Sequence, residues 1–464
     1  MPLPPAFLLA TQSFLGEEAA RRLFSAMQEP ATVSIRLNPA KTGLCAQAPT
    51  PAPCACTRVP WCTSGYYLQE RPRFTFDPLL HAGCYYVQEA SSMFLEQVVT
   101  QLLEHLPLAP EEVPAALDLC AAPGGKSTHL RSLLPDESLL VANEVIRSRA
   151  HILCENLTKW GHPGTVITRN DPADFGALPS CFDLILTDVP CSGEGMFRKE
   201  PAALEAWSTQ NVLLCQQRQR RIVADVWPSL KPGGLLIYST CTYNTAENEE
   251  NIRWICRELG AEAVALEVPD EWHLTGNLLS GESFPVYRFF PHLTRGEGFF
   301  LAVVRRHSPI PAQSATPPSA SRRTKEQSHP MSRPWLQQPA EYEWVLRGTR
   351  YTARLRRHRA LTEQLERSLH VLQAGVEVGE VKGKDLVPSH ALAMSSALCP
   401  DAFEHIPLDG AQATAYLRRE ALVLPPDAPS GYLLVTHQGV PLGFVKNIGN
   451  RANNLYPSEW RIRM

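Results

Sequence analysis

Two cysteines and one aspartate are the residues of this 464-residue chain best suited to covalent chemistry. Asp188-Val189-Pro190-Cys191 and Thr240-Cys241 each end an apolar run that predicts a β-strand. A thiolate is a nucleophile, and covalent catalysis divides one difficult step into two easier ones. A single cysteine in such a chain is usually inert. Two cysteines, one of them close to an aspartate, indicate a reactive site.

Substitution at carbon-5 of a cytosine ring is the chemistry that suits this set of groups. A thiolate bonded to carbon-6 turns the ring into an enamine, which can attack a methyl group. Asp188 could neutralise the charge that develops near N3, provided that its surroundings keep it partly protonated. A second thiol, or another base, would help to remove the carbon-5 proton. The spacing alone does not say whether Cys191 or Cys241 attacks the ring.

Residues 117–130 (LDLCAAPGGKSTHL) predict a strand, a turn of small residues and a helix. Gly125-Lys126-Ser127 is similar to the end of a phosphate-binding loop, but Cys120 stands where that motif needs a glycine, which argues against a nucleotide hydrolase. The dinucleotide fingerprint also fails, since it needs three glycines. Small residues let a ligand approach the backbone, and a helix start offers N–H groups to a carboxylate such as that of a methionine moiety.

Two acids follow the next two predicted strands. Glu144 is placed to accept hydrogen bonds from ribose hydroxyls, as an acid does at this point of dinucleotide-binding folds, and Asp171 could meet an adenine amino group. An acid at a strand end is common, so each residue taken alone fits a structural role equally well.

Short apolar runs alternate with helical stretches from residue 115 to about 306. The predicted strands are residues 115–119, 138–143, 164–169, 182–188, 233–239 and 298–304. This alternation favours a mostly parallel sheet covered by helices on both faces. Ligands of such sheets bind beyond the carboxyl ends of the strands. We therefore expect the CAAPGGK turn, Glu144, Asp171, Asp188, Cys191 and Cys241 on one rim.

The length predicts more than one domain. Residues 1–110 contain an expected helix over 14–27, a strand near 33–37 and a loop at 45–63. Residues 111–306 form the predicted catalytic domain, and residues 307–335 a linker rich in Pro, Ser and Ala. Residues 336–400 form an intermediate region, and residues 401–464 a β-rich module with a hairpin at 431–449.

The net charge of -3 is unevenly distributed. From residue 307 onward there are 19 Lys+Arg and 14 Asp+Glu, so +5, whereas the rest has 25 against 33, so -8. Six arginines lie between Arg347 and Arg359 with no acid among them. They favour either a phosphate-binding patch or a solvated helix face.

The 13 cysteines are odd in number and scattered, as expected of reduced thiols in the cytoplasm. Cys54, Cys56 and Cys62 have no matching pair at zinc-ligand spacing, so no metal is expected. No apolar run reaches the roughly 18–20 residues of a membrane span, and the first residues do not read as a signal peptide. We expect no membrane partner.

Four motifs, LDLCAAPGGKS, TDVPCSGEGMFRK, LKPGGLLIYSTCT and ENEENI, closely resemble those of the Sun/Fmu-type RNA (cytosine-5) methyltransferases. SIRLNP and YYVQEASSM resemble the N-terminal portion of that family. GVPLGFVKNIGNRANNLYP resembles the PUA-like RNA-binding module of its bacterial RsmF/YebU-like branch, which is known for modifying small-subunit (16S) ribosomal RNA. The resemblance implies a Rossmann-like S-adenosylmethionine-dependent methyltransferase fold. It also implies an N-terminal α+β RNA-binding region and a C-terminal PUA-like domain.

The resemblance also implies roles for single residues. Cys241 would be the nucleophile and Cys191 the thiol that assists release of the methylated base. Asp188 would contact the target cytosine and line the cofactor site. Contacts to S-adenosylmethionine would come from Cys120, Ala121, Ala122, Pro123, Gly124, Gly125, Lys126, Glu144 and Asp171.

The expected activity is formation of 5-methylcytosine in 16S ribosomal RNA in the cytoplasm. The alternatives are the same reaction on transfer RNA or large-subunit RNA, or a non-catalytic RNA-binding factor of ribosome assembly.

Overall fold

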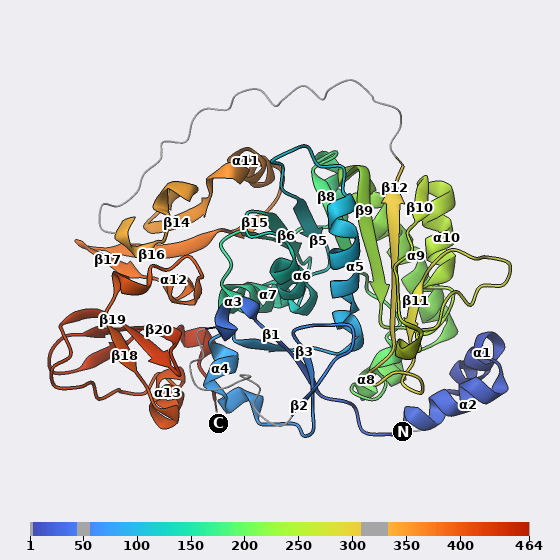
Figure 1. Ribbon diagram of the computed structural model, residues 1–464, viewed down its shortest axis with the longest axis horizontal. Coiled ribbons are helices and arrows are strands. Elements are labelled where there is room, and N and C mark those ends of the chain that lie inside the picture. Colours follow the sequence, from blue (N-terminus) through green and yellow to red (C-terminus); the bar gives the residue numbers. More distant parts are fainter. Residues whose placement is uncertain (1–2, 44–55, 308–332, 464) are drawn as a thin grey trace.

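The computed structural model describes residues 3–43, 56–307 and 333–463 (Figure 1). Most of the predicted linker, the first part of the predicted loop at 45–63, and Cys54 lie outside these ranges. Among the described residues, no helix has the length and apolar character needed to cross a membrane.

A nine-stranded sheet forms the middle of the described part of the molecule (Figure 1). Its strands are β5 (Ala115–Asp118), β6 (Leu139–Asn143), β7 (Thr165–Thr168), β8 (Phe182–Asp188), β9 (Leu230–Thr240), β10 (Ala261–Ala263), β11 (Tyr287–Phe289), β12 (Phe299–Arg306) and β15 (Val371–Ala374). The order is β10-β12-β9-β8-β5-β6-β7-β15, and β11 pairs with β12. The strands β9, β8, β5, β6 and β7 are parallel, whereas β12 and β15 run antiparallel to their neighbours. The expected mostly parallel sheet is confirmed.

Helices cover both faces of this sheet because its strands are apolar on both sides. Ala116, Leu140 and Leu184 pack in one cluster against α5 and α6, whereas Leu117 and Ile185 pack in another against α9 and α10. Side chains alternate between the faces along each strand, so neighbouring residues serve opposite cores. The covering helices are α5 (Leu95–Leu102), α6 (Gly125–Leu133), α7 (Arg147–Trp160), α9 (Thr209–Val226), α10 (Glu249–Glu258) and α11 (Arg359–Ser368).

The N-terminal region begins with two helices where one was expected over residues 14–27. They are α1 (Pro5–Leu15) and α2 (Glu17–Ala26). Gly16 separates them at φ 79°, a backbone conformation that glycine adopts easily and that ends a helix. A four-stranded sheet follows, in the order β2 (Cys56–Arg58), β3 (Gly65–Leu68), β1 (Ser34–Leu37), β4 (Tyr85–Val87), with short helices α3 (Pro39–Thr42) and α4 (Pro78–His81).

Two further four-stranded sheets lie beside the central sheet, at the left of Figure 1. The first contains β13 (Tyr342–Arg347), β14 (Arg350–Leu355), β16 (Val376–Lys382) and β17 (Asp385–Pro388), and α12 (His390–Met394) follows it. The second contains β18 (His405–Pro407), β19 (Gly431–His437), β20 (Val440–Asn447) and β21 (Ala452–Asn454), with α13 (Gly410–Leu417). Strands β19 and β20 form the expected hairpin. Strand β15 leaves the intermediate region and extends the central sheet beside β7.

Candidate active site

The two candidate catalytic cysteines lie side by side. Cys191 follows β8 and Cys241 follows β9, and these strands are parallel neighbours that pair Asp188 with Ser239. Their loops therefore leave the sheet at the same edge, and the two Sγ atoms lie 3.3 Å apart. The structure thus brings together the two residues that the sequence analysis singled out.

The Cys191 thiol ionises less readily than an ordinary thiol. The hydrogen bond with Cys241 and burial raise the pKa of Cys191 well above the usual value of a thiol. Cys191 therefore keeps its proton at neutral pH and is a poor resting nucleophile. That Cys241 is the attacking group remains a prediction.

Asp188 lies at the end of β8 within an ion pair. Its Oδ2 accepts a hydrogen bond from Lys126 Nζ at 2.9 Å, and its Oδ1 accepts one from Ser239 Oγ at 2.8 Å. Burial alone would lower the pKa of Lys126, but the nearby charge of Asp188 and the hydrogen bond to it raise it instead. Lys126 and Ser239 thus each bind one oxygen of Asp188, and the contact of this carboxyl group with the target base remains a prediction.

The predicted cofactor turn lies at the N-terminus of α6, next to this ion pair. The first N–H groups of a helix have no partner within the helix, so they are available to a ligand. Arg149 donates to the carbonyl of Ala122 at 2.8 Å, and Arg36 from β1 donates to Thr128 Oγ1 at 2.6 Å. Both arginines stabilise the turn, and neither was predicted from the sequence to do so.

Asp118, at the end of β5, is a buried acid that the sequence analysis missed. Ser127 Oγ donates to its Oδ2 at 2.6 Å, while no described residue makes a hydrogen bond to its buried Oδ1. Burial raises the pKa of Asp118 to about 7, although the bond from Ser127 lowers it. Burial therefore makes the protonated form of this carboxyl group more favourable than it is in water.

Glu144 and Asp171 follow β6 and β7, as expected. The buried Glu144 accepts a bond from the N–H of Ile146 at 2.9 Å and lies 3.4 Å from Arg149. Asp171 is 44% exposed, accepts a bond from the N–H of Ala173 and lies 3.5 Å from Arg221. Both carboxylates are on the rim, and their contacts to a cofactor remain predictions.

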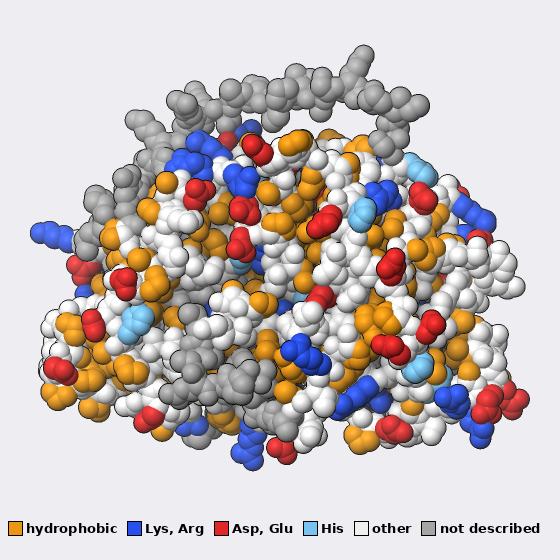
Figure 2. All heavy atoms as spheres, viewed as in Figure 1, with side chains coloured by type: hydrophobic (Ala, Val, Ile, Leu, Met, Phe, Trp, Pro, Cys, Tyr) orange, Lys and Arg blue, Asp and Glu red, His pale blue; other side chains and the backbone are white. Residues whose placement is uncertain are grey.

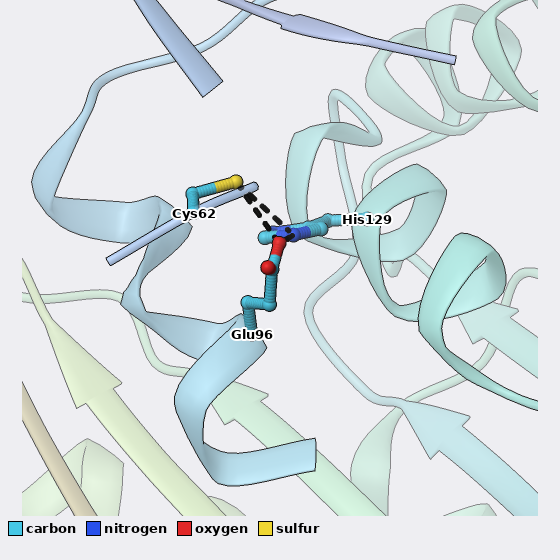
Figure 3. Close-up of side chains that lie close together, drawn as sticks. All are labelled: Cys62, Glu96 and His129. Atoms are coloured by element: carbon cyan, nitrogen blue, oxygen red, sulfur yellow. Dashed lines mark hydrogen bonds and ion pairs between the residues drawn. The ribbon is translucent and has the colours of Figure 1, made fainter. Parts of the chain in front are cut away.

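A buried cluster of Cys62, Glu96 and His129 joins the N-terminal region to α6 (Figure 3). Glu96 Oε2 lies 3.1 Å from Cys62 Sγ and 3.4 Å from His129 Nε2. Burial raises the pKa of Cys62 to about 12 and lowers that of His129 to about 4. Burial alone would raise the pKa of Glu96, but bonds from His129, the N–H of Thr63 and Cys62 lower it to about 2. A thiol, a neutral imidazole and a carboxylate therefore lie within one hydrogen-bonded cluster.

The arginines between Arg347 and Arg359 are mostly occupied by acids from other elements. Arg354 pairs with Glu343 and Glu366, at 2.9 Å each, and Arg347 also contacts Glu366. Arg350 lies 3.4 Å from Glu377. On the face drawn in Figure 2, basic and acidic side chains are interspersed. This stretch is therefore mainly an ion-pair network, which matches neither a free phosphate-binding patch nor a bare helix face.

Comparisons with known proteins identify the family to which each region is similar. The profile of 16S rRNA methyltransferase RsmB/F matches residues 105–305. Profiles of the N-terminal domain of 16S rRNA methyltransferase RsmF and of the RsmF PUA domain match residues 3–90 and 403–462.

Individual relatives extend over nearly the whole chain. Ribosomal RNA small subunit methyltransferase F of Erwinia tasmaniensis is 31% identical over 98% of this chain and 96% of its own length. The Salmonella agona protein of the same name is 32% identical with the same coverage. The structure of a methyltransferase homologue from Pyrococcus horikoshii, 29% identical, matches with a TM-score of 0.52 over 66% of this chain and all of that one. The chain therefore belongs to the RsmF family of 16S ribosomal RNA methyltransferases.

Proposed function

We propose that this protein transfers the methyl group of S-adenosylmethionine to carbon-5 of a cytosine in 16S ribosomal RNA. The observation that carries the proposal is the pair of thiols 3.3 Å apart, which lie next to the Lys126–Asp188 ion pair on the rim of the sheet. A methyltransferase acting on oxygen or nitrogen has no use for two adjacent thiols, whereas carbon-5 of cytosine needs covalent activation.

The start of α6, with Gly124 and Gly125, would hold the methionine part of S-adenosylmethionine, and Glu144 and Asp171 would hold its nucleoside. Val145 and Ile146, which are 53% and 48% exposed beside Glu144, offer an apolar surface to the adenine ring. When bound, the cofactor supplies an electrophilic methyl group. The small-residue turn, the helix N-terminus and the two acids fit these parts.

The chemical roles of the protein side chains follow from their positions. The Cys241 thiolate forms a bond to carbon-6, and the electron pair that moves to carbon-5 takes up the methyl group. Asp188, held by Lys126, orients the polar edge of the base. The carbon-5 proton then passes to Cys191, whose own proton has gone to solvent once Cys241 is bonded to carbon-6. The C6–S bond breaks and the Cys241 thiolate is restored. Cys191, whose Sγ touches that of Cys241, assists this last step.

The target cytosine must leave its stack to reach the rim, which costs a few kcal/mol that contacts to the RNA backbone must offset. Residues 1–110 and the module at 401–464 would provide these contacts. Ribosomal subunits reside in the cytoplasm, and the protein would act there.

The test is methyl transfer from labelled S-adenosylmethionine to small-subunit RNA that lacks the modification, presented free and as assembled subunits. We expect label in cytosine with wild type and none with Cys241→Ala. Label only in transfer RNA or large-subunit RNA would keep the mechanism and reject the substrate. RNA binding without label in any RNA would reject the enzyme and favour an assembly factor.

A further inference from the structure

Two buried glutamates connect the loops that carry the thiols. Each belongs to one loop and forms hydrogen bonds to the other. Glu194 lies three residues after Cys191, and Glu247 lies six residues after Cys241. Their exposed fractions are 2% and 0%. A buried carboxylate is tolerated only where donors surround it, so the partners of these two residues show what they hold.

Glu194 reaches from the Cys191 loop to the turn that follows Cys241. Its Oε2 accepts hydrogen bonds from Thr242 Oγ1 at 2.5 Å and from the N–H groups of Tyr243 and Asn244 at 2.6 and 2.9 Å. Its Oε1 accepts bonds from Asn244 Nδ2 at 3.0 Å and Trp207 Nε1 at 2.9 Å. One carboxylate therefore fixes both the backbone and the side chains of the turn behind Cys241.

Glu247 reaches in the other direction, from the loop that follows Cys241 to the loop that carries Cys191. Its Oε2 accepts bonds from the N–H of Ser192, the residue after Cys191, at 3.0 Å and from Gln219 Nε2 at 2.7 Å. Gln219 Nε2 also lies 3.0 Å from the carbonyl of Pro190, the residue before Cys191. Glu247 and Gln219 thus hold the backbone on both sides of Cys191.

The two loops also touch directly. The N–H of Gly195 donates to the carbonyl of Cys241 at 2.8 Å, and Ser192 Oγ lies 3.1 Å from Thr242 Oγ1. A Cβ on Gly195 would lie 2.5 Å from the carbonyl of Gly298, so only glycine allows this approach.

We propose that Glu194 and Glu247 are positioning residues for the methylation reaction. By joining the two loops, they keep both thiols on one face of the target base. The inference deepens the proposed function and rests on it. The two carboxylates serve different steps. Glu194 orients the Cys241 turn and hence the attack on carbon-6, whereas Glu247 orients Cys191 and hence the release of the product. Displacement of a reacting group by about 1 Å can cost about 100-fold in rate.

The test compares Glu194→Gln and Glu247→Gln in the full-length protein, with Glu205→Gln on the neighbouring α8 (Pro201–Ala206) as an exposed control. A glutamine of the same shape replaces one of the two acceptor oxygens by an NH₂ group, which breaks the bonds at that oxygen without removing volume. For both buried variants we expect kcat to fall about 10- to 100-fold with KM for RNA nearly unchanged. Glu247→Gln should also accumulate a protein–RNA adduct that survives denaturation, and Glu194→Gln should not. Glu205→Gln should match wild type.

A second readout needs no RNA. Oxidised glutathione should link Cys191 to Cys241 in the wild-type protein, and the rate, followed by mass spectrometry, should fall in both glutamine variants. Unchanged kcat and an unchanged linking rate would overturn the proposal. The proposal would also be overturned if kcat fell in the control variant Glu205→Gln as much as in the two buried variants.

If the glutamine variants do not fold, the milder Thr242→Val decides by the same two measurements. If the wild-type protein methylates no RNA but the variants still form the Cys191–Cys241 disulfide more slowly, the proposed function is rejected. The positioning role of the two glutamates is then retained.

Discussion

Replacing His129 with glutamine tests the junction between the N-terminal region and α6. Burial lowers the pKa of this imidazole from 6.5 to about 4. Below pH 6.5 the unfolded chain takes up a proton that the folded chain does not bind, so stability present above pH 6.5 is lost as the pH falls toward 4. One proton corresponds to about 1.4 kcal/mol per pH unit, so the full loss is about 3 kcal/mol.

Glutamine can still donate to Glu96 but carries no proton that titrates in this range. The stability of His129→Gln should therefore fall less steeply on acidification than that of wild type, by about 1.4 kcal/mol per pH unit between about pH 6 and about pH 4.5. Urea unfolding at closely spaced pH values and constant ionic strength measures the difference. His105→Gln, at an exposed position, should follow wild type. Parallel curves for wild type and His129→Gln would refute the presence of a buried neutral imidazole.

Three further substitutions test the site and its support. Cys241→Ala should abolish methyl transfer, because no bond to carbon-6 can form; labelling at the wild-type rate would exclude it as nucleophile. Cys191→Ala should slow release by about 10²–10⁴-fold and leave an RNA adduct on a denaturing gel. Intact turnover without an adduct would count against its role. Arg288→Met should reduce the free energy of unfolding by about 3–5 kcal/mol, because it leaves the buried Glu249 unpaired. A loss below about 1 kcal/mol in urea unfolding would contradict this assignment.

The central sheet and its rim could be predicted because their signals are local. Apolar runs of strand length alternate with helical stretches, and polar residues follow where each run ends. The contact between Cys191 and Cys241 follows once β8 and β9 are known to be adjacent and parallel. Adjacency itself is a property of the topology, and no pattern within either strand reports it.

What the sequence could not predict depends on partners far along the chain. The arginines at 347–359 have no acid among them, yet Glu343, Glu366 and Glu377 approach them once the strands pair. The pairing of Asp188 with Lys126 joins residues 62 positions apart. Charge neutralisation of this kind is decided in three dimensions, so composition alone overstated the basic character of this segment.

The N-terminal region supports the candidate cofactor turn and is also an expected RNA-binding surface. Arg36, fully buried, donates to Gly125 and Thr128 at the start of α6, and its guanidinium lies 4.4 Å from the Trp160 ring. His129, one turn further along α6, joins the cluster that contains Cys62. The helix that begins at the cofactor turn is thus held from outside the catalytic domain. Any displacement of the N-terminal sheet would therefore move the groups that hold the start of α6.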